Sequence, residues 1–194
     1  MQSFALIIVM ACWFAFATIF LLRKKPPKSP TAKRAPAARW GIALQALAYA
    51  AVWGVQRRYW PPILPLPRAL QDALSLVAIP LAIVSAWLTL SAVRTLGKQW
   101  SLDARLTDSH RLIVAGPYSY MRHPIYTAML GMMIATGLVV TYWPILAAAT
   151  VTFSIGTAIR VRAEEKLLRE AFGEDFEAYA RYVPAIVPRL HAGQ

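Results

Sequence analysis

Five stretches of mainly apolar residues, separated by polar segments, organise the chain. They cover residues 4–22, 41–56, 73–96, 125–140 and 142–159. A helix needs about 20 apolar residues to cross the hydrocarbon core of a membrane, and the first and third stretches reach that length. The second is shorter, and it spans only if the side chains of residues 57–60 extend to the interface. The pattern predicts a single all-α domain, residues 1–194: a polytopic membrane helix bundle of about five spans with a C-terminal cytoplasmic helix.

The cations between the stretches predict an orientation. Residues 23–39 hold seven Lys and Arg, whereas residues 57–72 hold three. Cytoplasmic loops of membrane proteins carry the excess of Lys and Arg, so the first loop is expected inside the cell. The N-terminus is then outside, and residues 94–122 and 160–194 face the cytoplasm.

The composition excludes several other classes. The chain is 58% hydrophobic and only 15% charged, with a mean hydropathy of +0.45. A net charge of +12 is compatible with nucleic-acid binding, but the cations concentrate in one loop instead of spreading over a face. The single cysteine, Cys12, excludes a scaffold held by internal disulfides. We expect membrane lipid as a partner, no nucleic acid and no obligate protein partner.

Sequence signatures of common cofactor sites do not occur. No G-x-G-x-x-G and no G-x-x-x-x-G-K-[ST] is found, so neither a Rossmann domain nor a P-loop is indicated. One cysteine and three widely separated histidines do not have the spacing of a zinc site, and no metal is expected.

A group of polar and aromatic residues stands before the fourth stretch. It consists of His110-Arg111-Leu112-Ile113, Gly116-Pro117-Tyr118 and Arg122-His123-Pro124-Ile125-Tyr126. Proline suits the first turn of a helix, so Pro124 is expected to begin one, with His123 at its cap. The N-terminus of a helix favours anionic groups. The two tyrosines offer ring faces for a flat ligand.

A second polar group follows the fifth stretch. Arg160 and Glu164 are four residues apart and share one face of a helix. The pairs Glu165–Arg169 and Lys166–Glu170 are typical of a solvated helix surface. Gln45, in the second stretch, is expected to form a hydrogen bond between helices.

Taken together, these segments resemble the isoprenylcysteine carboxyl methyltransferase family. The resemblance runs in order over about half of the chain, residues 97–188. Its motifs are Gly97-Lys-Gln-Trp100-Ser101, His110-x-Leu112-Ile113-x-x-Gly116-Pro117-Tyr118, Arg122-His123-Pro124-x-Tyr126, Arg160-x-x-x-Glu164-Glu165, Phe172-Gly173-x-x-Phe176-x-x-Tyr179 and Pro184.

The resemblance implies a methyltransferase that uses S-adenosyl-L-methionine without a Rossmann domain. The cofactor region comprises residues 97–126 and 160–188. By motif, the cofactor is lined by His110, Arg111, Leu112, Ile113, Tyr118, His123, Pro124, Ile125 and Tyr126, and Glu164 binds its cationic part. Arg160 and Arg122 are the predicted catalytic residues; Arg160 faces the methyl acceptor and Arg122 offers hydrogen-bond donors. Where the family tends to place Gln or Glu after Trp100-Ser101, Arg105 falls nearest, and that contact stays open.

Simple chemistry favours a carboxylate acceptor. A carboxylate is already anionic at neutral pH, so methyl transfer needs alignment and removal of water but no general base. The planar guanidinium of Arg160 can orient a carboxylate, whereas it would repel a protonated amine. We expect a lipophilic, prenylcysteine-like acceptor that enters from the bilayer. The alternatives are N- or S-methylation of a lipid or small molecule on the same fold, a nicotinamide-dependent membrane reductase, and a non-catalytic membrane subunit.

Overall fold

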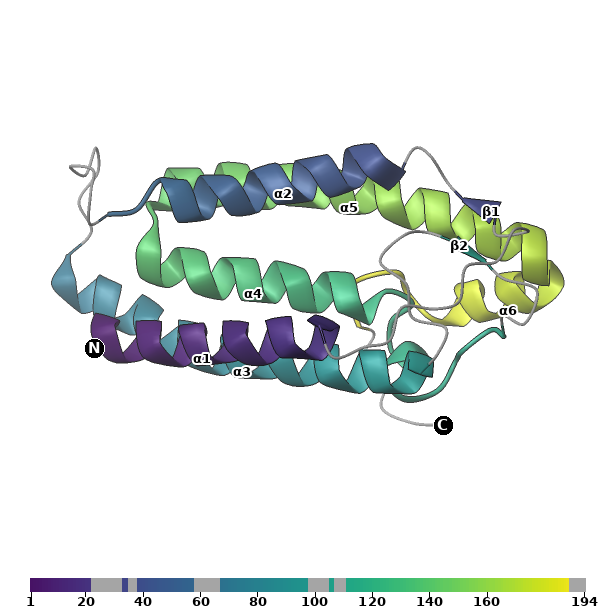
Figure 1. The fold of residues 1–194 in the computed structure, drawn as a ribbon, viewed down its shortest axis with the longest axis horizontal. Coiled ribbons are helices and arrows are strands. Elements are labelled where there is room, and N and C mark those ends of the chain that lie inside the picture. Colours follow the sequence, from purple (N-terminus) through teal and green to yellow (C-terminus); the bar gives the residue numbers. More distant parts are fainter. Residues whose placement is uncertain (22–32, 35–37, 58–66, 98–104, 107–110, 189–194) are drawn as a thin grey trace.

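The protein is a bundle of long helices. The computed structural model describes residues 1–21, 33–34, 38–57, 67–97, 105–106 and 111–188. The helices are α1 (Gln2–Leu21), α2 (Ala38–Gly54), α3 (Arg68–Leu96), α4 (Pro124–Val140), α5 (Trp143–Phe172) and α6 (Glu174–Tyr182), with a 3-10 turn, η2 (Gly116–Ser119). Helices α1 to α5 run alongside one another in alternating directions, and α6 lies at the end opposite the start of α1 (Figure 1). The predicted all-α bundle is confirmed.

The apolar stretches located the helices, but three boundaries differ. Helices α2 and α3 begin at Ala38 and Arg68, a few residues before their apolar stretches. The predicted fifth span and the charged helical segment expected after it form one helix, because α5 continues without a break to Phe172. The charged residues there are good helix formers, so a change in polarity does not interrupt the backbone. The break comes at Gly173, whose φ of +50° suits glycine and separates α5 from α6.

Within the part of the chain that the structure describes, three helices meet the requirement for a membrane span by length and composition: α1, α3 and α5. Helix α4 is apolar but has 17 residues, as does α2. At 1.5 Å per residue such helices are about 25 Å long, a little shorter than the hydrocarbon core of about 30 Å. Large apolar side chains point outward, among them Ile7, Phe14, Trp40 and Trp87. This surface suits lipid and is consistent with a membrane protein.

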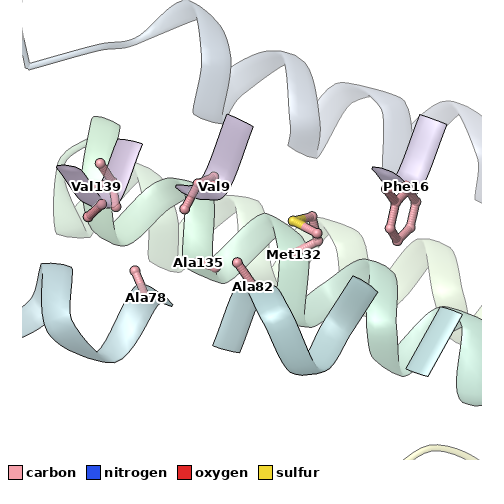
Figure 2. Packing of buried hydrophobic residues seen from close by; sticks show 8 residues of the cluster. Val9, Phe16, Ala78, Ala82, Met132, Ala135 and Val139 are labelled. Atoms are coloured by element: carbon pink, nitrogen blue, oxygen red, sulfur yellow. The ribbon is translucent and has the colours of Figure 1, made fainter. Parts of the chain in front are cut away.

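Small side chains let the helices pack closely. One core cluster joins α1, α3 and α4, and Figure 2 shows its members converging from the three helices: Val9, Phe16, Ala78, Ala82, Met132, Ala135 and Val139. In a membrane, where apolar burial gives little drive for association, close contact between small residues stabilises helix pairs. The core therefore combines small residues, which let the backbones approach, with larger side chains such as Phe16 and Met132.

The end of the bundle that holds the start of α4 also gathers two loops. Strand β1 (Lys33–Arg34) pairs antiparallel with β2 (Arg105–Leu106), with Lys33 opposite Leu106. This pairing joins the loop after α1 to the loop after α3. Two polar segments that the cation pattern placed on one side of the membrane thus meet at one end of the bundle.

At the other end of α4, the structure gives Arg57 a partner that the sequence did not indicate. Its Nη2 donates to the carbonyl oxygen of Leu138 at 2.6 Å, and its expected place at the membrane interface stays a prediction. Its backbone N–H donates to the carbonyl of Val140 at 2.9 Å. The last carbonyls of a helix have no partner within the helix, and a cation there complements the helix dipole. Arg57 therefore closes the C-terminus of α4. Residues 58–60, predicted to act with it, lie outside the described residues.

Candidate active site

The site is built around the first turn of α4. Pro124 occupies the first helical position and His123 the N-cap, as predicted. The carbonyl of His123 accepts hydrogen bonds from the N–H groups of Tyr126 and Thr127, at 3.1 and 3.3 Å. This turn fixes the rings of His123 and Tyr126 in a stacked arrangement, with centroids 5.7 Å apart and planes 19° from parallel. The motif thus places two aromatic side chains on one side of the helix start.

The buried imidazole of His123 lies between two carboxylates of α5. Its Nδ1 is 3.5 Å from Glu164, and its Nε2 is 3.3 Å from Glu165. Burial opposes the charged imidazolium, but the hydrogen bonds and charges of the two carboxylates outweigh it and raise the pKa of His123. The raised pKa favours the cationic form, which links α4 to α5.

Glu165 is a buried ion-pair partner, which corrects the interpretation of Glu165–Arg169 as an ordinary surface pair. Nε and Nη2 of Arg122 lie 2.9 and 2.8 Å from its Oε1. Arg169 also contacts it, at 3.4 Å, from the exposed side. Burial alone would raise the pKa of Glu165, but hydrogen bonds from His123 and Arg122 and their charges lower it to about 2. Glu165 therefore stays ionised and holds the loop before α4 against α5.

Arg122, predicted as catalytic, is occupied by partners within the chain. Besides Glu165, its Nη1 donates to the carbonyl oxygens of Ala180, at 3.1 Å, and Val183. The segment after α6 continues this contact, because the N–H groups of Arg122 and His123 donate to the carbonyls of Pro184 and Ala185, both at 2.9 Å. In this structure Arg122 fastens the C-terminal segment over the site. Its catalytic role stays a prediction.

Glu164 is the accessible acid of the site. Its side chain is 23% exposed, against 8% for Glu165. It accepts a hydrogen bond from the hydroxyl of Tyr126, and Nη2 of Arg160 lies 3.8 Å away, one helical turn before it. The expectation that Arg160 and Glu164 share one helix face is confirmed. A carboxylate that is held by its neighbours and still reaches solvent is suited to binding a cation.

Arg160 is the buried cation of the site, with 5% of its surface exposed. Its guanidinium carbon lies 4.8 Å from the centre of the Tyr126 ring, and its Nη1 donates to Oε1 of Gln45 at 3.0 Å. The hydrogen bond predicted for Gln45 between helices is thus confirmed. A guanidinium that is buried against an aromatic ring is shielded from water, so its charge attracts a nearby anion strongly. Arg160 can therefore orient an anionic group.

The remaining predicted cofactor residues lie on the segment that leads to α4. Tyr118 is buried in η2, and its carbonyl accepts a hydrogen bond from the hydroxyl of Tyr179 at 2.6 Å. Burial raises the pKa of Tyr118 and raises that of Tyr179 to about 12, so both stay neutral. Arg111 is exposed, and the half-buried residues are Leu112, Ile113 and Ile125. His110 lies outside the described residues.

Sequence reasoning missed two features of the site. The adjacent acids Glu164 and Glu165 point about 100° apart on a helix, so only one of them can share the face of Arg160. That spacing could have indicated a different partner for Glu165, but not which one. No pattern in the sequence indicated that the chain after α6 returns to the start of α4. Among the residues that the structure describes, no group of three or more His, Cys, Asp or Glu side chains is placed to hold a metal ion.

Fold and site together define a helical membrane protein with a cluster of charged side chains at one end of its bundle. The sequence model of the phospholipid methyltransferase family matches residues 74–175, more than half of the chain. The chain therefore belongs to this family of membrane methyltransferases, which includes the isoprenylcysteine carboxyl methyltransferases. The resemblance found in the sequence is confirmed. The charged side chains of the site all lie within the matched residues: Arg122, His123, Arg160, Glu164 and Glu165. Gln45 and the segment after α6 lie outside them.

Individual relatives are similar over part of their length. The probable protein-S-isoprenylcysteine O-methyltransferase of Oryza sativa subsp. japonica is 30% identical over 116 residues, 59% of this chain and 61% of the relative. Protein-S-isoprenylcysteine O-methyltransferase B of Arabidopsis thaliana is 32% identical over 102 residues, 50% of this chain and 51% of the relative. The cobalt-zinc-cadmium resistance protein CzcN of Cupriavidus metallidurans is 32% identical over 100 residues, which are 51% of this chain and 46% of the relative. The match spans about half the length of these curated relatives.

Proposed function

We propose that the chain transfers a methyl group from S-adenosylmethionine to the carboxylate of a lipophilic, prenylcysteine-like acceptor. The observation that carries the proposal is the pair Glu164 and Arg160. An accessible anion and a buried cation lie 3.8 Å apart on one face of α5, at the end of an apolar bundle. One member suits a cationic methyl donor and the other an anionic acceptor. Membership of a methyltransferase family and the names of the plant relatives support the same choice.

The residues present fit the donor. S-adenosylmethionine carries a sulfonium, an ammonium and a carboxylate, and when bound it would supply an electrophilic methyl group. Glu164, partly exposed, would hold its cationic part, and the stacked rings of His123 and Tyr126 offer a flat surface beside it. The half-buried Leu112, Ile113 and Ile125 would give apolar contacts. Charged hydrogen bonds of this kind are worth about 1.5–3 kcal/mol each.

The acceptor would be aligned by Arg160. The guanidinium fork can hold one carboxylate oxygen in line with the methyl carbon while the apolar bundle excludes water from it. The new O–C bond forms as the C–S bond breaks, and the electron pair of that bond stays on sulfur. No proton moves, so the site needs no general base. The acceptor's apolar tail would reach the site from the bilayer.

The description of the family favours a second candidate, N-methylation of a phospholipid amine. An amine must lose a proton before it attacks, and the neighbouring base would be His123. The carboxylates around His123 raise its pKa, which favours the protonated ring over the neutral form that could accept a proton. Arg160 would also repel an ammonium group. These two features make the carboxylate the better choice.

An acceptor panel tests the proposal. Detergent-purified protein is given S-adenosylmethionine with a labelled methyl group and matched farnesyl compounds ending in a carboxylate, an amine or a thiol. Base-labile methyl label in the carboxylate compound is the expected result. Label only in the amine or thiol compound would replace the proposed acceptor. Binding of a nicotinamide cofactor and not of S-adenosylmethionine would contradict methyl transfer and favour a membrane reductase.

The orientation is also a proposal. The cation-rich loop of residues 23–39 favours a cytoplasmic site, where a soluble donor is available. A reporter fused after Gln194 should be cytoplasmic and one fused at Met1 external. Both ends on the same side would contradict the five-span arrangement.

A further inference from the structure

A buried amide on α2 connects Arg160 to the interior of the bundle. Gln45 is 2% exposed. Its Oε1 accepts from Nη1 of Arg160 at 3.0 Å, and its Nε2 donates to Oγ1 of Thr157 at 2.8 Å. Because arginine only donates hydrogen bonds, the amide oxygen has to face Arg160, and the hydroxyl of Thr157 takes the other end. The amide is thus held at both ends and cannot rotate freely.

Two glycines bring α2 close enough for this contact. A Cβ on Gly156 would lie 2.7 Å from the carbonyl oxygen of Gly41, closer than real Cβ contacts. A Cβ on Gly41 would meet the same part of α5 and the side chain of Arg160. Because α2 and α5 run in opposite directions, Arg160 lies against Gly41 and Gln45 lies against Gly156, on the two sides of the crossing. The absence of side chains at both glycines leaves room for Gln45 and Arg160 to reach across the crossing to each other.

Gln45 and Glu164 hold the guanidinium from different helices. Nη1 binds the amide of α2, whereas Nη2 faces Glu164 on α5 at a looser 3.8 Å. The ring of Tyr126 on α4 lies against the same guanidinium. Without the amide, the strongest attraction on Arg160 is the carboxylate of Glu164. A closer pair would turn the fork away from an acceptor and neutralise the acid that a cationic donor needs.

We propose that Gln45 is a positioning residue of the acceptor site, which keeps Arg160 separated from Glu164 so that each can bind its own ligand. The proposal rests on the function proposed above. Gln45 lies outside residues 74–175, the part of the chain that matches the family. The acceptor side of the site thus depends on α2, a helix that the family match does not include. Differences in α2 would then change acceptor preference more than they change the affinity for the donor.

A double-mutant cycle tests this role. Gln45→Leu should lower kcat/KM for the farnesyl carboxylate about tenfold, as expected for loss of a hydrogen bond to a charged group. The Kd of S-adenosylmethionine should rise by a smaller factor, about threefold, because Arg160 then pairs more closely with Glu164, which holds the cationic part of the donor. In an Arg160→Lys background, Gln45→Leu should cause no further loss, because its effect passes through the guanidinium. A merely structural role would give the same additional loss in both backgrounds, and that result would overturn the proposal.

Two further variants keep the test decisive. Thr157→Val leaves Gln45 in place but frees its amide, and should lower kcat/KM about threefold, again only when Arg160 is present. It carries the test if Gln45→Leu does not fold. Thr136→Val is the matched control, because it removes a buried hydrogen bond, from Trp13 at 2.9 Å, far from Arg160.

Failure of this inference and failure of the proposed function can be told apart. If the parent protein is active and Gln45→Leu and Thr136→Val have equal kcat/KM values for the farnesyl carboxylate, this inference alone is overturned. A parent that neither binds S-adenosylmethionine nor methylates any acceptor overturns the proposed function and this inference with it.

Discussion

The two ends of α4 are both closed by half-buried arginine side chains, but with different partners. At the C-terminal end, Arg57 binds backbone carbonyls, and the hydroxyl of Thr141 binds the carbonyl of Val55. At the N-terminal end, Arg122 binds the carboxylate of Glu165, with His123 beside it. Cations at a helix C-terminus and acids near an N-terminus both complement the helix dipole. A favourable interaction with the helix dipole is therefore found at both ends of α4 and does not by itself indicate a function.

What distinguishes the N-terminal end is an ionised group that remains accessible. The contacts of Arg57 that the structure describes are with neutral groups of the backbone, which it caps. The N-terminal cluster instead leaves Glu164 partly exposed beside the buried Arg160. A closed cap can only stabilise, whereas an accessible acid next to a buried cation can bind ligands of both signs. A half-buried arginine at the helix end would by itself have marked both ends as sites.

The largest expected effect comes from breaking the charged end. Arg122→Met leaves the carboxylate of Glu165 buried without its main cation, and removal of one partner of such a pair costs about 3–5 kcal/mol. Chemical unfolding in detergent micelles measures the loss. Adding Glu165→Gln should restore part of the stability, because it removes the unpaired charge.

The neutral end provides the matched control. Arg57→Met removes the hydrogen bond from the guanidinium to the carbonyl of Leu138, keeps the backbone bond to Val140, and should lower the free energy of unfolding by only about 1–2 kcal/mol. Equal losses for Arg57→Met and Arg122→Met would show that the two ends do not differ in the way described.

The next effect is on turnover. Arg160→Lys keeps the charge but loses the guanidinium fork, so turnover should fall about tenfold or more while the donor Kd stays close to the parent value. Arg162→Lys, an exposed arginine on the same helix, is the control and should be neutral. Unchanged turnover in Arg160→Lys would remove the main support for a carboxylate acceptor.

Much of this comparison could be predicted from the sequence, because it follows from local patterns. Apolar stretches located five helices, Pro124 marked the start of α4, and the spacing of Arg160 and Glu164 placed them on one face. The parts that were missed depend on which helices become neighbours. Glu165 looked like a surface residue because its partner, Arg122, is 43 positions away. Arg57 looked like an interface anchor because nothing local shows that it meets the end of α4.

A smaller effect is expected from pH. The pKa of His123 is raised in the folded protein, so its contribution to stability is complete below the ordinary value of 6.5 and is lost as the pH rises through the higher folded value. The pKa of Glu165 is lowered to about 2, so its contribution is complete above 4.5 and is lost only in acid. The unfolding temperature of the parent should thus decline from neutral toward alkaline pH, and His123→Asn should flatten that decline. An equally steep decline in the variant would show that His123 is not the titrating group.

The most direct test of the account is the affinity for S-adenosylmethionine, measured by calorimetry on the parent and on Glu164→Gln. The substitution keeps size and shape but removes the accessible charge, so the donor Kd should rise about tenfold while the unfolding temperature changes little. Glu174→Gln, at the exposed start of α6, controls for a change in overall charge and should leave the Kd unchanged. Equal donor affinity in the parent and in Glu164→Gln would contradict the claim that the charged end of α4 is a donor site.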